Sequence, residues 1–423
     1  MALLVASPKL RAPPMTADLL RAQYEAYPYP ARDAGDETRR LVTGSPSHLD
    51  QLNHYVFGGR LDFSAPLRVL VAGGGTGDAT IMLAQQLATA GVPAQITYLD
   101  LSTASRRIAE ARAARRGLAN IEFRTGSLLD LGGLGPFDYI DCCGVIHHLS
   151  DPAAGLRSLL AALAPGGGIG LMVYAPYGRA GVYPMQDALR TLTAGLAPAE
   201  QVKAARRVLR ALPERNGLRN NPLVGDHLVS DAGLYDLLLH SCDRAYTVSE
   251  LAALVAACGL AITALIEPAQ YDPASYIKDA QTLKRLEGVS WLERAAWAEQ
   301  VGGALGKHVA YLVRPEDAAG AVARLEGLTA VPVLRDSDGP ALARGMPPGA
   351  VLDAGFPGLE LVLPLPRLAG PILARVDGRT SLADIFEAVR ALDRGLGAES
   401  FEVQARALFR TLNGIGKMYL RAG

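Results

Sequence analysis

A short apolar run that leads directly into a cluster of glycines constrains this chain more than any other feature. The segment reads RVLVAGGGTGD, and Val69–Ala72 is long enough for a strand buried on both faces. Ala79–Leu87 then has the pattern of the first turns of a helix. Glycine tolerates positive φ and lets a ligand approach the backbone, and a helix start presents free N–H groups. This strand–turn–helix unit predicts a ligand-binding turn in an α/β fold. Its glycines are Gly73, Gly74, Gly75 and Gly77.

The spacing of these glycines argues against two common nucleotide sites. A dinucleotide fold needs G-x-G-x-x-G, and here the third glycine is misplaced, so a dehydrogenase is a distant alternative. A phosphate loop ends in Gly-Lys-Ser/Thr, and no Lys follows the glycines. Asp78 at the helix start would repel a pyrophosphate and favours a ligand that carries positive charge, such as an ammonium or a sulfonium.

The next strands also end in residues suited to a ligand. Ala94–Leu101 ends near Asp100, where a carboxylate can accept both hydroxyls of a ribose. Ile121–Arg124 is followed by a Gly-Ser-Leu turn, and Phe137–Gly144 leads into two adjacent histidines. Further strands are predicted at Ile169–Tyr174, Leu260–Glu267 and Lys307–Arg314, the last of them antiparallel.

Five segments together resemble the class I S-adenosylmethionine-dependent methyltransferases. In order they read VLVAGGGTGD, ITYLDLS, FRTGSLLDL, FDYIDCCGVIHHLSDP and LAPGGGIGLMVY. The resemblance implies an α/β fold, with a seven-stranded, mostly parallel sheet and helices on both faces, and S-adenosylmethionine as cofactor. It assigns the ribose hydroxyls to Asp100, the adenine edge to Ser127 and Leu128, and the surroundings of the sulfonium to Cys143 and Gly144. The full predicted cofactor set is Ala72, Gly73, Gly74, Gly75, Gly77, Asp78, Asp100, Leu101, Ser127, Leu128, Cys143 and Gly144.

Two positions depart from the family pattern. Val71 stands where the family often has an acidic residue, two positions before the first glycine. The ammonium of the cofactor must then be held otherwise, by Asp78 or by backbone carbonyls. Ser127 stands where the family usually has Asp.

Methyl transfer from a sulfonium is an in-line displacement, so the protein mainly positions the nucleophile and excludes water. A base helps only where the acceptor is a protonated amine, thiol or hydroxyl. The predicted candidates are His147, His148 and Tyr177, in that order, because a neutral imidazole can take a proton near pH 7. The alternative is that the two histidines only order the loop before Asp151. No Asn-Pro-Pro-Tyr or Asp-Pro-Pro-Tyr motif is present, which argues against a glutamine amide or a base amine as acceptor.

Substrate residues are expected in a segment before the first strand and in an insertion after the fifth. In similar methyltransferases the first segment forms a lid, and the predicted substrate residues are Tyr24, Tyr27 and Tyr29 in the lid and Arg179 and Tyr183 in the insertion. Tyr55 is a further candidate for the closed site. Arg179 would suit a carboxylate, and the alternative for all of these residues is packing or surface pairing. His227, Asp231 and His240 have irregular spacing, so no metal is expected.

The chain of 423 residues is too long for one ordinary core. The predicted parts are a lid over residues 1–65, a methyltransferase domain over 66–315 with helical insertions at 175–247 and 268–306, and a small α+β module over 316–423. Residues 1–15 are expected to be loose. Ala330–Gly349 suggests a linker or short hairpin, and the stretch from Ile372 to Leu382 loosely resembles small winged-helix modules.

Charge and cysteine content indicate the class of partner. The 42 basic and 42 acidic side chains balance, so attraction to nucleic acid or to an anionic membrane is not expected. The basic stretch Arg106–Arg116 is interpreted as a solvated helix face. The chain has four cysteines without C-x-x-C spacing and no long apolar run, which favours a cytoplasmic protein. The opening residues have too short an apolar core for a secretory signal.

Three functions remain open from the sequence. The first is a methyltransferase acting on O or N of a small molecule. The second is a protein or peptide methyltransferase that uses the C-terminal module for docking. The third is a cofactor-binding scaffold without catalysis, which only Val71 supports. A homodimer is left open.

Overall fold

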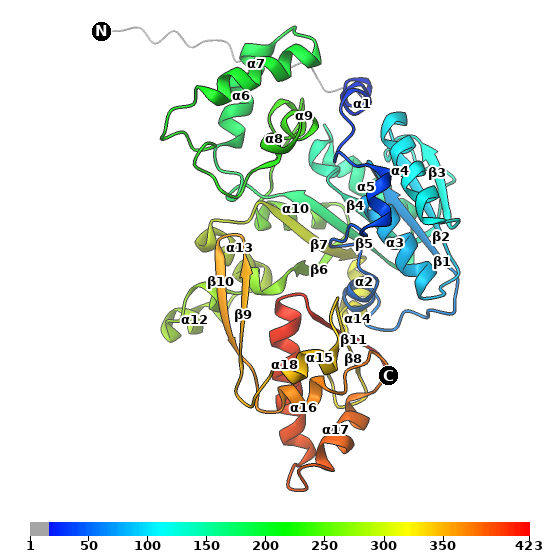
Figure 1. Cartoon of the computed structure of the whole chain (residues 1–423), viewed down its shortest axis with the longest axis vertical. Coiled ribbons are helices and arrows are strands. Elements are labelled where there is room, and N and C mark those ends of the chain that lie inside the picture. Colours follow the sequence, from blue (N-terminus) through cyan, green and yellow to red (C-terminus); the bar gives the residue numbers. More distant parts are fainter. Residues whose placement is uncertain (1–16) are drawn as a thin grey trace.

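A seven-stranded sheet organises the computed structural model, which describes residues 17–423 (Figure 1). Its strand order is β3-β2-β1-β4-β5-β7-β6, and only β7 runs antiparallel to its neighbours. The strands are β1 (Leu67–Ala72), β2 (Ala94–Asp100), β3 (Ile121–Thr125), β4 (Phe137–Cys143), β5 (Leu163–Tyr174), β6 (Ala261–Ile266) and β7 (Lys307–Val313). The predicted α/β class, the seven strands and the antiparallel seventh are confirmed. Residues 1–15, expected to be loose, lie outside the described part.

Helices cover both faces of this sheet because its strands are apolar on both sides. One face buries Val69 and Val71 against Leu52 and Leu83, and the other face buries Leu70 against its own set of helices. The covering helices are α2 (Leu49–Val56) and α3 (Asp78–Thr89) on the first face, and α5 (Pro152–Ala162), α10 (Val248–Ala257) and α13 (Trp291–Gly302) on the second, with α4 (Thr103–Arg116) beside α3. Short helices fill the connections: η2 (Ile146–His148), η4 (Pro268–Tyr271), α11 (Pro273–Tyr276), α12 (Ala280–Leu286), η5 (Pro315–Asp317) and α14 (Ala318–Ala321).

The segment between β5 and α10 forms a cap of helices with its own apolar core. The cap consists of α6 (Val182–Thr193), α7 (Pro198–Arg210), α8 (Asp226–Val229), α9 (Asp231–Leu234) and η3 (Tyr235–Leu239). Figure 1 shows it at the opposite end of the molecule from the C-terminal module, next to α1 (Ala17–Ala26). These helices lie within residues 175–247, where the sequence predicts a helical insertion.

The C-terminal module contains strands that the sequence did not indicate. Within residues 330–349, interpreted as a linker or hairpin, the structure has a strand and a helix, because β8 pairs with the distant β11. A hairpin of β9 and β10 was also not predicted. The elements are β8 (Val331–Leu334), α15 (Gly339–Arg344), β9 (Val351–Phe356), β10 (Leu359–Pro364), α16 (Ala369–Leu373), α17 (Leu382–Arg390), α18 (Ala398–Gly414) and β11 (Met418–Arg421). The resemblance to winged-helix modules stays a prediction.

This module is joined to the sheet domain through buried contacts. Tyr419 on β11 lies in the same apolar cluster as the first face of the sheet, and its hydroxyl accepts a hydrogen bond from Gln51 at 2.8 Å. The backbone N–H of Leu420 donates to His54 Nδ1, and Arg421 pairs with Asp50. Removal of the module would therefore open the core beneath α2.

One helix predicted as a solvated basic face buries an arginine instead. Arg112 on α4 is 1% exposed, and its guanidinium donates to Glu37 at 2.7 Å and to Asp78 at 2.7 Å. Glu37 lies on η1 (Ala34–Thr38) and also pairs with Arg116. The basic face thus clamps the N-terminal segment onto the sheet. On the same helix, Arg106 pairs with Glu110, and both side chains are partly exposed.

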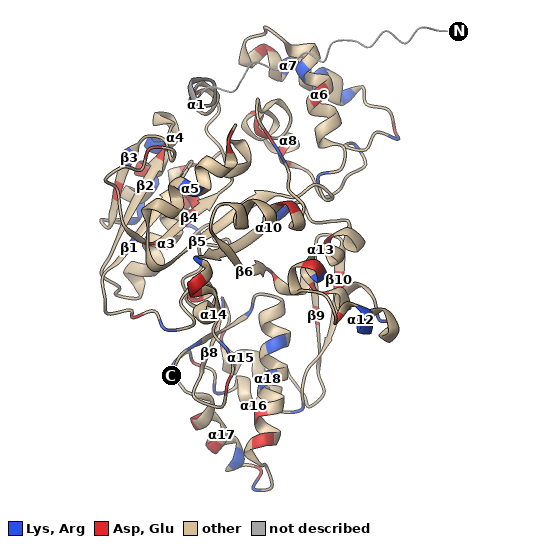
Figure 2. Ribbon diagram, turned by 180° about the vertical axis from the view of Figure 1, so that it is seen from behind, with Lys and Arg blue, Asp and Glu red and all other residues tan. Residues whose placement is uncertain are grey.

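Elsewhere the charges are interspersed. Figure 2 shows basic and acidic positions alternating along the ribbon, in keeping with the balanced composition. In the part of the chain from residue 17 onward, no helix combines the length and the apolar character needed to span a membrane.

The buried clamp should carry stability. Glu37→Gln removes one of the two carboxylates that pair with the buried guanidinium of Arg112. We therefore expect the free energy of unfolding to fall by about 3 kcal/mol. Urea denaturation measures it. Glu200→Gln, which breaks an exposed pair with Lys203 on α7, is the control and should change nothing measurable. Equal effects of the two variants on the free energy of unfolding would contradict a stabilising role of the pair between Glu37 and Arg112.

Candidate functional site

A cavity of about 440 Å³ lies at the carboxyl ends of β1, β2 and β4, between the sheet, the N-terminal segment and the cap. This is the edge of an open parallel sheet at which ligands bind. A larger cavity, of about 540 Å³, lies along the edge strand β6 between α11, α12 and α13, away from the glycine turn. The smaller cavity holds the polar groups on which chemistry depends, so we take it as the candidate site.

The glycine turn forms one wall because no side chain fits there. Gly73 has φ +76°, and a Cβ on it would come within 2.3 Å of a methyl group of Val145. A Cβ on Gly74 would meet the ring of Tyr98 at the same distance. The Tyr98 hydroxyl donates to the carbonyl of Gly75 at 2.7 Å, which fixes the turn against β2. The backbone is therefore bare and rigid at this wall.

Asp100 lies directly beside this turn, as predicted. Its Oδ2 accepts the N–H of Gly75 at 2.8 Å, and its Oδ1 accepts the N–H of Ser102 at 2.8 Å. Burial raises the pKa of Asp100, although these two N–H donors act in the opposite direction. Two backbone donors fix the carboxylate and leave lone pairs free for a ligand's hydroxyls.

The N-terminal segment closes the cavity. Thr76 in the turn donates its hydroxyl to the carbonyl of Pro30 at 2.7 Å, and Glu25 on α1 accepts the N–H of Ala104 at the start of α4. Tyr24 and Tyr29 line the cavity. Their roles in a lid and in substrate binding stay predictions.

Two other tyrosines from this part of the chain do not line the cavity. Tyr27 stacks on Tyr235 at 5.0 Å between ring centroids, within the core of the cap. Tyr55 packs on Tyr311 beneath the C-terminal module. The suggestion that Tyr55 lines the closed site is wrong, and its role is packing.

A hydrogen-bonded polar cluster forms the wall on the cap side. Asp236 on η3 accepts the hydroxyl of Tyr24 at 3.3 Å and that of Tyr174 at 3.2 Å. The Tyr24 hydroxyl also lies 3.3 Å from His240 Nε2. The N–H of Cys242 donates to His240 Nδ1, so a neutral His240 carries its proton on Nε2 and donates to Tyr24. Burial raises the pKa of Asp236 and lowers that of His240.

The two predicted histidines have different positions. His148 lines the cavity, and its Nδ1 lies 2.8 Å from the carbonyl of Cys242. A carbonyl only accepts, so Nδ1 carries the proton and Nε2 of a neutral His148 has a free lone pair. His147 is fully buried behind it, between the rings of His148 and Tyr174, and neither of its nitrogens has a hydrogen-bond partner within residues 17–423. Burial lowers the pKa of His147.

Arg179 is not placed to bind a substrate carboxylate. Its guanidinium donates to Asp243 at 2.8 Å and to the Tyr183 hydroxyl at 3.2 Å, and it lies 3.7 Å from the centroid of the Tyr174 ring. The positive charge is therefore already paired within the protein. Arg179 and Tyr183 anchor the cap to the end of β5.

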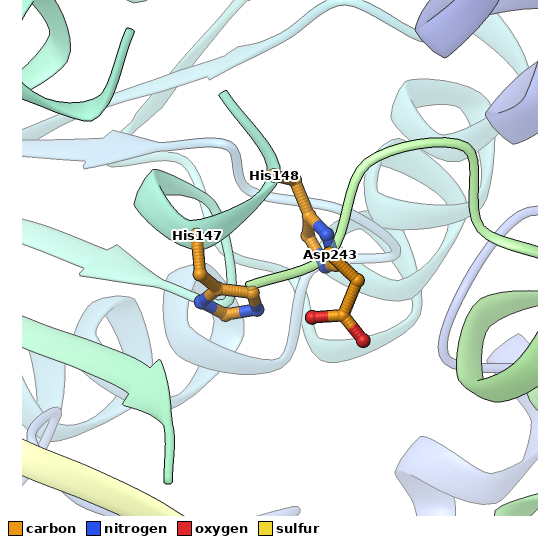
Figure 3. Close-up of side chains that lie close together, drawn as sticks. All are labelled: His147, His148 and Asp243. Atoms are coloured by element: carbon orange, nitrogen blue, oxygen red, sulfur yellow. The ribbon is translucent and has the colours of Figure 1, made fainter. Parts of the chain in front are cut away.

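The histidines also belong to groups with metal-ligand character. Figure 3 shows the carboxylate of Asp243, on the segment after η3, beside the rings of His147 and His148; their ligand atoms lie within 4.8 Å of one another. However, Asp243 already holds the Arg179 guanidinium, which opposes a second cation. The other group consists of His148, Asp236 and His240. In it, His240 Nε2 lies 3.3 Å from the Tyr24 hydroxyl and His240 Nδ1 accepts the N–H of Cys242, so neither nitrogen is left for a metal ion. The expectation that no metal is bound stays a prediction.

The structure gathers most, but not all, of the predicted residues around the cavity. Those that line it are Tyr24, Tyr29, Gly73, Gly74, Gly75, Asp78, Asp100, Leu101, Ser127, Leu128, Cys143, Gly144 and His148. Those that do not are Tyr27, Ala72, Gly77, His147, Tyr177, Arg179 and Tyr183. Lining residues that were not predicted as site residues include Arg32, Asp141, Met172, Tyr174, Asp236 and Lys307. Asp236 carried no local signal, because only the fold of the cap brings it to the sheet, whereas Tyr174 is the last residue of β5.

Known proteins have sequences related to this chain. Residues 70–169 match the methyltransferase domain family. An uncharacterized protein of Synechococcus sp. is 31% identical over 294 residues, covering 67% of this chain and 68% of its own. This chain belongs to the class I S-adenosylmethionine-dependent methyltransferases. A ubiquinone biosynthesis O-methyltransferase of Albidiferax ferrireducens is 28% identical over 211 residues, which is 47% of this methyltransferase and 79% of that protein.

The fold of this methyltransferase also resembles a solved structure over nearly its whole length. PKMT2 from Rickettsia typhi has a TM-score of 0.59 at 14% identity, covering 90% of this chain and 76% of that one. Its complex with AdoHcy has a TM-score of 0.58.

S-adenosylmethionine is the cofactor of this methyltransferase, and two observations agree with a site for it here. Gly73, Gly74 and Gly75 line the cavity with bare backbone, and a Cβ on Gly73 or Gly74 would clash with Val145 or Tyr98. Asp141, which lines the same cavity, has a buried carboxylate oxygen without a partner in the described part of the chain.

If Arg179 anchors the cap, its loss should destabilise the fold of this methyltransferase. Arg179→Met leaves the Asp243 carboxylate buried without a cation, so we expect the free energy of unfolding to fall by about 3 kcal/mol. Adding Asp243→Asn removes the stranded charge and should recover part of the loss. Chemical denaturation of both variants measures this. Unchanged stability with a raised KM alone would instead favour the substrate role predicted from the sequence.

Proposed function

We propose that this methyltransferase transfers a methyl group to an O or N nucleophile of a small molecule in the 440 Å³ cavity. When bound, S-adenosylmethionine supplies an activated methyl group on a positively charged sulfur. Gly73, Gly74 and Gly75 would face its methionine part and ribose, and Asp100 would hold the ribose hydroxyls. Ser127 and Leu128 would contact the adenine edge, while Cys143 and Gly144 would lie beside the reacting sulfur.

The size and closure of the cavity support a small acceptor. The same space must take both the cofactor and the reacting part of the acceptor. The lid and the cap meet over it through the hydrogen bond from Tyr24 to Asp236. Such closure excludes water and positions the reacting atoms, which accounts for much of the barrier reduction in transfer reactions.

The observation that carries the proposal is the free Nε2 of His148. The Cys242 carbonyl fixes the tautomer and the ring orientation, so the lone pair of Nε2 is held ready. Nε2 would accept the proton of an O–H or N–H acceptor as the new bond to carbon forms. Asp236, Tyr24 and Tyr174 would orient the same acceptor by hydrogen bonds. His147 and Tyr177, which do not line the cavity, have no part in this proposal.

A fractionation experiment tests the class of acceptor. The purified protein is given labelled S-adenosylmethionine and a cell extract separated by ultrafiltration into small molecules and macromolecules. Label is expected in the small-molecule fraction. Label confined to protein would contradict the proposal and favour the alternative in which the C-terminal module docks a protein or peptide.

Asp100 should control cofactor affinity. Asp100→Asn removes the charge that strengthens the ribose hydrogen bonds, so we expect the Kd for S-adenosylmethionine to rise at least tenfold, about 1.4 kcal/mol. Isothermal titration calorimetry measures it. Asp138→Asn, at the other end of β4, is the matched control and should bind as the unchanged protein does. An unaltered Kd for Asp100→Asn would show that the ribose lies elsewhere.

His148 should control turnover rather than cofactor binding. His148→Gln keeps a polar side chain but removes the basic nitrogen, so we expect kcat to fall by about 100-fold or more. The Kd for S-adenosylhomocysteine should stay within a factor of about two. His227→Gln, on α8 and away from the cavity, is the control for general loss of a histidine. Retained kcat in His148→Gln would mean that positioning alone suffices.

A further inference from the structure

Asp141 on β4 lies beside Val71 on β1, the position at which this family often has an acidic residue. Val71 and Asp141 are register partners on neighbouring parallel strands, and both line the cavity. Register partners in a sheet point to the same face and lie about 5 Å apart. A carboxylate at Asp141 therefore stands one strand away from the place where many relatives of this family carry theirs.

One oxygen of this carboxylate is without a partner. Asp141 is 0% exposed, and its Oδ2 accepts the Ser47 hydroxyl at 2.6 Å. Oδ1 is buried and has no hydrogen-bond partner within the described residues, and no ion pair found in residues 17–423 includes Asp141. An unpaired buried carboxylate is costly to a folded protein, and such costs are retained mainly where a ligand removes them.

The other acids around the cavity already have partners. Asp78, suggested by the sequence as a holder of the ammonium, pairs with Arg32 at 2.6 Å and with Arg112 at 2.7 Å. Asp100 is bonded to the glycine turn, and Asp236 accepts two tyrosine hydroxyls. Among these cavity acids, Asp141 is thus the one with an oxygen for which the described residues supply no hydrogen-bond partner.

We propose that Asp141 Oδ1 binds the α-ammonium of S-adenosylmethionine and so replaces the acidic residue absent at Val71. The inference rests on the cofactor placement given under the proposed function. A hydrogen bond between an ammonium and a carboxylate is about twice as strong as one between neutral groups. The proposed contact differs from the expectation that Asp78 or backbone carbonyls hold the ammonium.

A double cycle, in which the amino group of the ligand and the side chain of Asp141 are each altered alone and together, tests the contact directly. Calorimetry gives the Kd of S-adenosylhomocysteine and of its analogue in which hydrogen replaces the α-amino group, for the unchanged protein and for Asp141→Asn. Asn has the same shape and still accepts the Ser47 hydroxyl. We expect loss of the amino group to weaken binding at least tenfold in the unchanged protein and less than twofold in Asp141→Asn. Asp138→Asn, on the same strand, should behave as the unchanged protein.

The outcomes separate this inference from the cofactor placement. A full tenfold effect of the amino group in Asp141→Asn would overturn the role of Asp141 while leaving the cavity as the cofactor site. Failure of Asp100→Asn to alter affinity would instead overturn the placement. Should Asp141→Asn not fold, the absence of an amino-group effect in the unchanged protein would still refute the proposal.

The stability of the ligand-free protein gives a second measurement. Burial raises the pKa of Asp141 to about 6, so its stabilising contribution is present below pH 4 and is lost as the pH rises through 6. The Ser47 hydroxyl and the Cys143 thiol face Asp141, and their hydrogen bonds oppose this rise in its pKa. Tyr139 and Tyr311, on β7, also face it; burial raises the pKa values of the tyrosines and of the thiol, which keeps them neutral. We expect Asp141→Asn to melt higher than the unchanged protein at pH 8, with the difference narrowing as the pH falls through 6 and closing below pH 4. A lower Tm at pH 8 would count against an uncompensated charge.

Discussion

The close approach of three backbone segments at the glycine turn is the constraint on which the rest of the structure depends. The turn after β1 touches the end of β2 through Tyr98 and Asp100 and the N-terminal segment through Thr76. A side chain at Gly73 or Gly74 would push these segments apart. Because the same bare backbone forms a wall of the cavity, one local feature sets both the fold of the first β–α unit and the place where a ligand fits.

Closure of the cavity depends on a different kind of interaction, since charged groups rather than apolar surface join the N-terminal segment to α4. The pairs of Glu37 with Arg112 and of Arg32 with Asp78 are buried or half-buried, and they orient the segment from which Tyr24 and Tyr29 reach the cavity. Buried pairs contribute little to net stability compared with apolar packing, but they tolerate few alternative arrangements. A segment that must close over a ligand in one position is a suitable place for them.

The sequence predicted what is encoded locally. The strands of the sheet, the glycine turn and Asp100 follow from apolar runs, spacing and family resemblance. The predicted strand boundaries agree within two residues, except that β5 begins six residues before the predicted Ile169. Features set by distant contacts were missed: β8 forms because β11 returns to it, and Asp236 reaches the cavity because the cap folds over β5. The roles of two arginines could not be predicted from their charge. From the sequence, Arg179 is interpreted as a substrate-binding residue and Arg112 as part of a solvated face. The structure pairs Arg179 with the buried Asp243 and Arg112 with the buried Glu37.

The departure at Val71 shows how a missing residue can be informative once the sheet is known. From the sequence, the absence of an acidic residue at Val71 is the only argument for a cofactor-binding scaffold without catalysis. In the sheet, the neighbouring strand presents Asp141 at the same level and on the same face, so the cavity keeps a carboxylate there. Two neighbouring strands can each place a side chain at nearly the same point of the cavity wall, as Val71 and Asp141 do. A carboxylate needed at that point can therefore come from either strand. Val71 is therefore no evidence of lost function, since the charge that it lacks stands one strand away.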